Sequence, residues 1–229
     1  YIIWLSEIIL QQTRIEQGLP YYKTFINAFP TVYDLAKSKE EKIYKLWQGL
    51  GYYSRAANLH LTAKKIVNEY NGVFPSSHDE LKSLRGIGDY TASAIGSICF
   101  DLPEAVVDGN VFRFLGRFFG ITTPINSQKG FKVFKIKANK LIKSQSPGDF
   151  NQALMDFGSI QCKPKAPDCG ICVFSKKCYA FKNNKVESLP VKIKKPKIRI
   201  RYLNYLVFHN SKHQTVLEQI KLKGIWHKL

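Results

Sequence analysis

Four of the five cysteines lie within residues 162–178, and this cluster constrains the fold more than any other feature of the chain. They follow the spacing C-x6-C-x2-C-x5-C and are Cys162, Cys169, Cys172 and Cys178. Four thiolates from one short segment can hold a [4Fe-4S] cluster, while a zinc site and disulfides are the alternatives. The pattern favours iron–sulfur over zinc. The fifth cysteine, Cys99, lies outside this pattern and is expected to be a small core residue.

The charge balance points to a polyanionic partner. The 229 residues carry a formal net charge of +18, from 35 basic and 17 acidic side chains. Such a surplus favours nucleic acid. An anionic membrane is the alternative, but we find no lipidation motif, signal peptide or apolar run near the roughly 20 residues of a membrane span. Unpaired cysteines fit a reducing compartment, so we expect an intracellular, DNA-associated protein and no membrane partner.

The chain divides into three parts by pattern. Apolar residues recur at three and four over residues 1 to about 160, which predicts helices. Residues 182–201 carry eight basic side chains against one acidic, which indicates an exposed linker near the polyanion or merely in solvent. Beyond residue 202 we expect two strands joined by a polar turn at 209–213. Because the sequence opens inside a helical pattern and stops inside a strand-like one, we expect a fragment truncated at both ends.

A glycine-rich turn joins two predicted helices in the segment 77–96. The first helix should end near Arg85, the turn Gly86-Ile87-Gly88 follows, and the second helix should begin at about Asp89. Glycines permit a tight turn and close backbone approach, and the free N–H groups of the second helix favour a phosphate. A helix C-cap with no ligand is the structural alternative.

Two carboxylates have the setting of catalytic groups. Asp108 follows an apolar pair and precedes a helix-like run, so it is either a helix N-cap, a functional carboxylate or both. Glu7 lies among ten residues of which eight are apolar, so its helix should be buried. Burial raises the pKa of a carboxyl, which must then be paired, with Arg14 for example, or kept for proton transfer.

Polar amides and aromatics close to these groups are candidates for ligand contacts. Gln11 lies one turn beyond Glu7, with Gln12 beside it. In the segment 47–60, Tyr52 and Tyr53 could stack on bases, and Arg55 could lie near a phosphate. We also expect one of the two tyrosines to be a core residue.

Several phrases together resemble the MutY-type adenine DNA glycosylases, members of the helix-hairpin-helix DNA glycosylase superfamily. They are WLSEIILQQT, LWQGLGYYSRAANLH, LRGIGDYTASAI, VVDGNVFR and FNQALMDFGSIQC, in the family's order, followed by the cysteine spacing. The resemblance implies a mostly α, two-lobed catalytic domain over residues 1–181, with the active site in the cleft between lobes and the iron–sulfur loop at 162–178. It further implies a basic linker over 182–201 and the truncated start of an α+β Nudix-like domain over 202–229.

The resemblance also implies roles for single residues. Glu7 would be the general acid that protonates adenine, and Asp108 would stabilise the oxocarbenium sugar, with Tyr90 and Asn110 close by. The cysteines would bind a [4Fe-4S] cluster, and Gln12 and Tyr52 would probe or wedge the duplex. The expected DNA contacts as a whole are Gln11, Gln12, Tyr52, Arg55, Gly86, Gly88, Lys163 and Lys165.

The implied activity is removal of adenine opposite 8-oxoguanine or guanine, by a monomer acting on double-stranded DNA. The related endonuclease III-type enzymes carry a catalytic lysine where this chain has Tyr90, and a tyrosine has no amine for a Schiff base. We therefore expect a monofunctional enzyme. An endonuclease III-like glycosylase/lyase for oxidised pyrimidines and a non-catalytic DNA-binding module are the alternatives.

Overall fold

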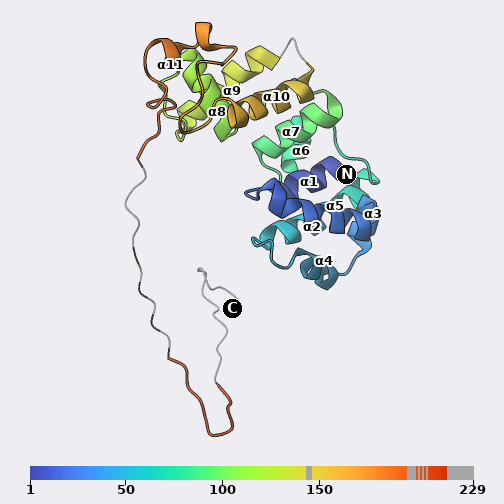
Figure 1. Cartoon of the computed structure of the whole chain (residues 1–229). Helices are drawn as coiled ribbons and strands as arrows, with labels where there is room; N and C mark the ends of the chain where they lie inside the picture. The colour runs from blue at the N-terminus through green and yellow to red at the C-terminus, as the bar shows by residue number, and fades with distance from the viewer. Residues whose placement is uncertain (143–145, 195–199, 201, 203, 205, 216–229) are drawn as a thin grey trace. The chain divides into compact units, whose positions relative to one another are not determined.

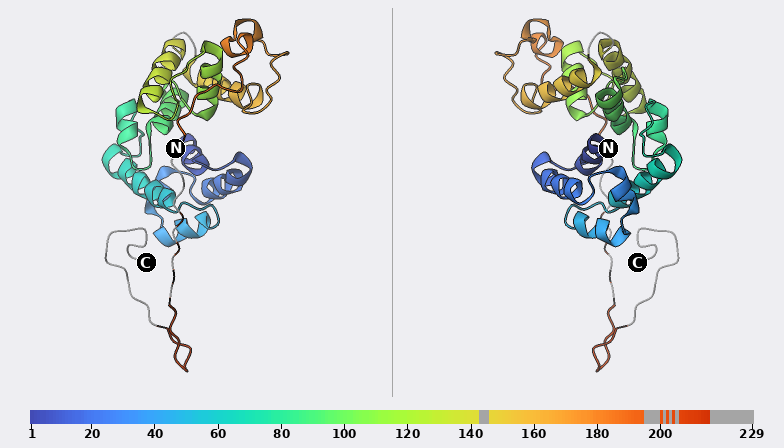
Figure 2. Two further views of the ribbon diagram at one scale, coloured as in Figure 1. Left: turned by 90° about the vertical axis from the view of Figure 1, so that its left-hand side faces the viewer. Right: turned by 90° about the vertical axis from the view of Figure 1, so that its right-hand side faces the viewer.

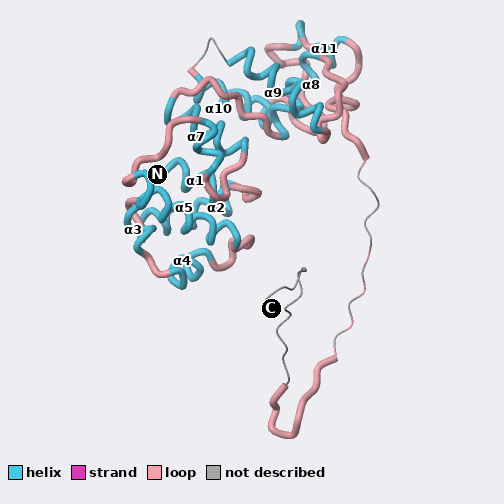
Figure 3. The backbone as a smooth tube through the Cα atoms, turned by 180° about the vertical axis from the view of Figure 1, so that it is seen from behind, coloured by secondary structure: helices cyan, strands magenta, loops and turns pink. Residues whose placement is uncertain are grey.

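Helices and loops build the part of the chain described by the computed structural model, which covers residues 1–142, 146–194, 200, 202, 204 and 206–215. Contacts divide the chain into two units, Tyr1–Ile193 and Lys194–Leu229. Figure 3 shows only helix and loop colours along the described backbone. The helical pattern predicted for residues 1–160 is therefore confirmed.

The first unit contains the named helices. They are α1 (Ile2–Leu10), α2 (Ile15–Ala28), α3 (Val32–Lys37), α4 (Glu40–Trp47), α5 (Ser54–Tyr70), α6 (His78–Ser83), α7 (Asp89–Phe100), α8 (Gly109–Phe119), α9 (Gln128–Ile142), α10 (Pro147–Ile160), the 3-10 turn η1 (Ser175–Lys177) and α11 (Tyr179–Lys182). None of the helices described in the chain is long and apolar enough to cross a membrane.

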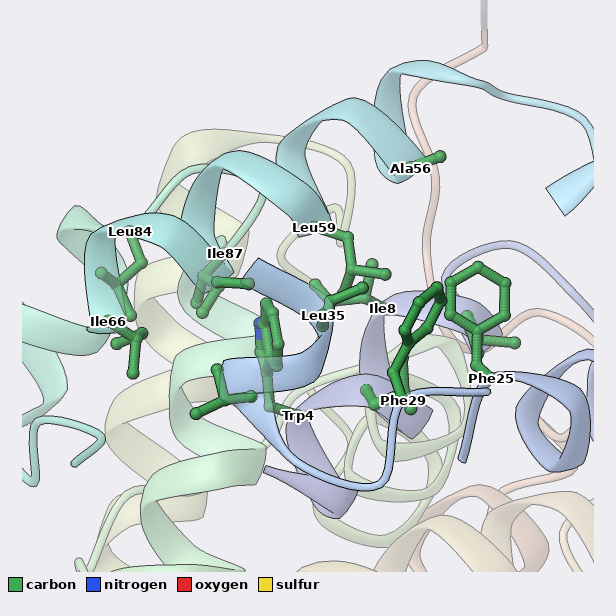
Figure 4. Packing of buried hydrophobic residues seen from close by; sticks show 14 of the residues in the cluster. Trp4, Ile8, Phe25, Phe29, Leu35, Ala56, Leu59, Ile66, Leu84 and Ile87 are labelled. Carbon is green, nitrogen blue, oxygen red and sulfur yellow. The ribbon is translucent and has the colours of Figure 1, made fainter. Parts of the chain in front are cut away.

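One hydrophobic core joins α1 to α7, and Figure 4 shows its packing around Trp4 and Phe25. The Phe25 ring meets the fully buried Trp47 edge-on, at 5.6 Å between centroids. Four residues of α1, Trp4, Leu5, Ile8 and Ile9, are buried, so α1 crosses the centre of this lobe. An apolar helix with few polar positions is stable there because several neighbouring helices cover it.

A second core lies among α8, α9 and α10. Phe134 at its centre packs edge-on against Phe112, at 5.0 Å between centroids. In Figures 1 and 2 these helices gather with α11, apart from α1 to α6. Helix α7 contacts α1 and α6 of the first core and α10 of the second. The two cores agree with the expected two lobes, and α7 joins them.

The first unit extends past the expected domain end at residue 181. Buried Arg117 donates hydrogen bonds to the carbonyls of Val186 (3.0 Å) and Leu189 (3.1 Å). Further on, the Ile125 N–H donates to the Val191 carbonyl at 3.0 Å. Hydrogen bonds to their backbone thus anchor residues 182–193 to the first unit, although most of these residues are exposed, as expected from their charge.

The second unit shows a polar turn but no strand in its described residues. An isolated antiparallel bridge joins His209 to Thr215, and the Asn210 N–H donates to the Gln214 carbonyl at 3.1 Å. The turn expected at 209–213 is therefore present, whereas its two flanking strands are not assigned. Most of the expected Nudix-like segment, including residues 216–229, lies outside the described residues.

Candidate active site

Glu7, Tyr90 and Asp108 lie near one another on the elements that join the two cores. Glu7 lies on α1, Tyr90 is the second residue of α7, and Asp108 precedes α8. Burial raises the pKa of the Tyr90 hydroxyl, and the nearby charges of Glu7 and Asp108 raise it further. The hydroxyl lies 3.5 Å from the Met155 thioether on α10. Tertiary packing therefore brings together residues that lie about 100 positions apart in the sequence.

Glu7 has the properties of a proton donor. Burial raises the pKa of its carboxyl. Within the described residues, no hydrogen bond or ion pair engages this carboxyl, and Arg14 is an exposed residue at the start of α2. The ion pair with Arg14, one of the alternatives for Glu7, is therefore absent from the described structure. A half-buried carboxyl without a partner favours its protonated form.

Asp108 is both a helix N-cap and a candidate functional carboxylate. Its Oδ1 accepts hydrogen bonds from the backbone N–H groups of Asn110 (2.9 Å) and Val111 (2.8 Å). Its Oδ2 accepts from the Asn110 side-chain amide at 2.8 Å. Three donors at the positive end of a helix suit an anionic oxygen pair. The capping role is confirmed, and Asn110 lies beside the aspartate as expected.

Arg113 connects this carboxylate to the cysteine loop, which the sequence analysis did not foresee. Its Nη2 donates to Asn110 Oδ1 at 2.8 Å and to the Gly158 carbonyl, and its Nε donates to the Cys162 carbonyl at 2.6 Å. The side chain is buried. An arginine one turn into the helix that Asp108 caps is the signal that would have pointed to it.

The predicted turn between two helices is present at α6 and α7. Gly86 has φ +80°, a conformation that favours glycine, and Gly88 caps a helix that begins at Asp89 as predicted. A Cβ at Gly88 would meet nothing within 4 Å, so the turn leaves open space for another molecule. The Gln11 amide donates to the Gly86 carbonyl at 3.0 Å. Gln11 thus braces the turn from α1.

Two exposed side chains project from loops whose backbone is left-handed. Gln12 has φ 54° and Tyr52 has φ 49°, and the Tyr52 side chain is 65% exposed. Non-glycine residues in this region carry a conformational cost and cluster at functional sites. Tyr53 is also exposed, at 47%, so the expectation that one of these tyrosines lies in the core is wrong. Both tyrosines lie directly before α5, of which Tyr53 is the N-cap.

Arg55 occupies the interior and not a phosphate site. Its guanidinium is buried and donates to the carbonyls of Ile9 (2.8 Å) and Gln11 (2.7 Å) at the end of α1. It also lies over the Tyr52 ring, 5.6 Å from the centroid. The expected phosphate contact of Arg55 is therefore wrong, because the charge is used to cap α1 and to support the exposed loops.

We expect Arg55→Met to lower the free energy of unfolding by about 2–4 kcal/mol, because carbonyls at the end of α1 lose their buried donor. Urea denaturation measures this, with the exposed Arg14→Met as the matched loss of charge. Parental stability combined with weakened DNA binding would contradict this role and restore the phosphate contact.

Cys99 also differs from its expected position. It is exposed at the end of α7 and not in the core. Partial burial raises the pKa of its thiol, and the charge of Glu7 raises it further.

The other four cysteines line one cavity, walled by five phenylalanines, Phe114, Phe118, Phe157, Phe174 and Phe181. Burial raises the pKa of the Cys169 thiol, and the other three thiols raise it further, which reflects their mutual proximity. Within the described ranges, no three His, Cys, Asp or Glu side chains form a site for a single metal ion. The four cysteines therefore share one largely apolar cavity.

Arg117 shapes the loop between Cys162 and Cys169. Its Nη1 donates to the Lys163 carbonyl at 2.7 Å and lies 3.5 Å from Cys162 Sγ. The side chains of Lys163 and Lys165 are exposed on this loop. A buried arginine therefore holds the backbone of the loop, and the two lysines remain available at the surface.

The comparisons with known proteins identify the family. Residues 5–136 match a family profile described as HhH-GPD superfamily base excision DNA repair protein. This match spans more than half of the chain. The chain belongs to the HhH-GPD superfamily.

Similar proteins and solved structures are consistent with this family assignment. An adenine DNA glycosylase of Buchnera aphidicola is 38% identical over the whole chain and is itself covered to 66%. A thermostable thymine-DNA glycosylase has a similar structure (TM-score 0.73, 30% identity, 80% of this chain and 84% of that one). An endonuclease III in complex with DNA shares the fold (TM-score 0.68, 22% identity, 80% and 84%). The chain thus spans just under two thirds of its curated bacterial relatives' length.

Proposed function

We propose that this HhH-GPD chain is a monofunctional adenine DNA glycosylase that removes adenine opposite 8-oxoguanine or guanine. One observation carries the proposal: an unpaired carboxyl with a raised pKa, Glu7, and a hydrogen-bonded helix-capping carboxylate, Asp108, flank Tyr90. Breakage of a glycosidic bond requires one carboxyl that can donate a proton and a second that can stabilise positive charge on the sugar. The adenine DNA glycosylases among its relatives support the choice of base.

The reaction breaks the bond between adenine and the sugar C1′. Adenine first leaves the base stack, at a cost of a few kcal/mol. Glu7 donates its proton to adenine, so the electron pair of the bond departs with a neutral base. The Asp108 carboxylate stabilises the positive charge on the sugar, and water then adds to C1′ and releases a proton. Tyr90 lies near both carboxyls and cannot form a Schiff base, so the DNA strand stays intact.

Charge and exposed loops support DNA as the partner. The net charge of +18 favours a phosphate backbone, and binding should weaken steeply as salt rises. The open turn at Gly86–Gly88 and the exposed Lys163 and Lys165 are proposed backbone contacts. Gln12 and Tyr52, exposed in costly conformations, are proposed to enter the duplex beside the extruded base.

We propose that Cys162, Cys169, Cys172 and Cys178 hold a [4Fe-4S] cluster. Four thiols from one short segment around one apolar cavity suit the four-cysteine ligation of a [4Fe-4S] cluster, with zinc as the alternative. Bound there, the cluster would cross-link the loop, and Arg117 would keep Cys162 in place. Iron and acid-labile sulfide in the purified protein would support this, and stoichiometric zinc would contradict it.

A single-turnover assay tests the activity on duplexes with adenine opposite 8-oxoguanine, guanine or thymine. Strand breaks that appear only after hot alkali, and only for the purine mispairs, are expected. Breaks without alkali would indicate the endonuclease III-like alternative. Binding of duplex without base release would indicate a DNA-binding module.

A further inference from the structure

Lys135 of α9 occupies an unusual position for a lysine, because it is largely buried between the two lobes. Its side chain is 16% exposed. Its Nζ donates to the Ala105 carbonyl at 2.7 Å and to Ser93 Oγ at 2.8 Å. It also lies 3.2 Å from a Glu104 oxygen and 3.6 Å from an Asp89 oxygen. A buried ammonium is retained only where such partners compensate for its lost hydration.

These partners lie directly before two proposed active-site residues. Asp89 is the first residue of α7, and Tyr90 follows it. Glu104 and Ala105 belong to the connecting segment, residues 101–107, that ends at Asp108. One ammonium group therefore contacts both backbone segments that place Tyr90 and Asp108.

The connecting segment has little regular structure of its own and depends on side chains from the second lobe. Asn139 of α9 accepts the Ala105 N–H at 2.9 Å, and Asn151 of α10 accepts the Val106 N–H at 2.9 Å. Lys135 supplies the missing donor to the Ala105 carbonyl. Asn151 also contacts α7, through Ser97 Oγ at 2.8 Å in its C-terminal half, whereas Lys135 contacts Asp89 at its first residue.

The negative charge of the Asp89 carboxylate would be unfavourable at this position without a nearby positive charge. It lies beside the Gly86–Gly88 turn, where the proposed phosphate contact would be repelled by a carboxylate. Lys82 and Lys135 approach it at 3.3 and 3.6 Å, and His78 lies at 3.7 Å. Of these, Lys135 is the one that comes from the other lobe.

We propose that Lys135 is a positioning residue, which ties the start of α7 to the connecting segment so that Tyr90 and Asp108 face the same sugar. This inference rests on the proposed glycosylase function. Loss of the ammonium should misplace the two residues relative to each other and slow base release, while the surfaces that grip DNA remain.

The test compares Lys135→Met with Lys132→Met in the full chain, because Lys132 is exposed on the same helix and its loss removes the same charge. Single-turnover adenine release should fall about 10- to 100-fold in Lys135→Met, since small misplacements carry costs of this size. Duplex affinity should match that of Lys132→Met, and Lys135→Arg should restore part of the rate. A rate within twofold of the parent, or no restoration by arginine, would overturn the proposal.

A second measurement is independent of activity. Backbone hydrogen exchange over residues 101–108 and 89–91 should accelerate in Lys135→Met and not in Lys132→Met. If Lys135→Met does not fold, Glu104→Gln replaces it and should show the same two effects, smaller in size. Unchanged exchange overturns the positioning role. If exchange is faster in Lys135→Met but the parent chain releases no adenine, the glycosylase function is rejected and the coupling between the lobes is kept.

Discussion

Glu7→Gln is expected to abolish adenine release, a loss of about 10²–10⁴-fold, while duplex affinity stays close to that of the parent. Glutamine has nearly the same shape and cannot donate a proton to the leaving base. The carboxyl makes no hydrogen bond or ion pair among the described residues, so its replacement should leave the packing of α1 intact. Single-turnover release and fluorescence anisotropy on one duplex separate the two quantities.

The same group predicts how rate and stability depend on pH. Because burial raises the pKa of Glu7, the protonated donor persists above the usual range and is lost as pH rises through the raised pKa. The rate should fall with it, and this decline should be absent from any residual activity of Glu7→Gln. The folded state binds the proton more tightly than the unfolded chain, so folding stability also declines over that interval. Glu7→Gln should therefore be more stable than the parent at neutral pH.

Retained adenine release in Glu7→Gln would reject Glu7 as the acid. Lost release accompanied by lost duplex binding would show a structural role instead. Thermal unfolding across pH distinguishes these results, since a structural role predicts a lower melting temperature at neutral pH rather than a higher one.

Asp108→Asn is expected to reduce adenine release by about 10²–10³-fold, because the sugar cation loses its stabilising charge. Asparagine caps helices nearly as well as aspartate, so α8 should still begin at Gly109. The new amide would face the Asn110 amide, whose oxygen is held by Arg113, at a cost of about 1 kcal/mol. A large loss of activity with a small loss of stability is thus expected.

Asp108→Ala provides the matched comparison. It removes charge and cap together and should lose a further 0.5–2 kcal/mol, roughly, in chemical denaturation. If Asp108→Asn were as active as the parent while Asp108→Ala were destabilised, Asp108 would be an N-cap only. Comparable losses of release in both variants, with unequal stability, would support the catalytic role.

The helices and the turn between α6 and α7 followed from local patterns. Apolar periodicity located the helical region, and the glycine pair with Asp89 located the start of α7, because backbone conformation depends on neighbouring residues. Helix capping by Asp108 was likewise visible in sequence. The family profile supports the fold implied by the resemblance.

The exposure of single side chains was predicted less well than the location of the helices. Arg55 resembled a surface cation but lies in the core, whereas Tyr53 and Cys99 resembled core residues but are exposed. The basic composition of 182–201 indicated an exposed linker but not that Arg117 holds the backbone carbonyls of Val186 and Leu189 within it. For Arg55 and for residues 186–189, the hydrogen-bond partners are distant in sequence.

By itself, the sequence determined which residue types were available, where helices begin and that four thiols come from one segment. Those properties arise from local backbone and side-chain preferences. Only the tertiary structure decided that Glu7, Tyr90 and Asp108 meet, that Arg113 links the aspartate to the cysteine loop, and that Lys135 joins both lobes. Such contacts depend on the packing of α1, α7, α8 and α9 against one another, which spacing along the chain does not encode.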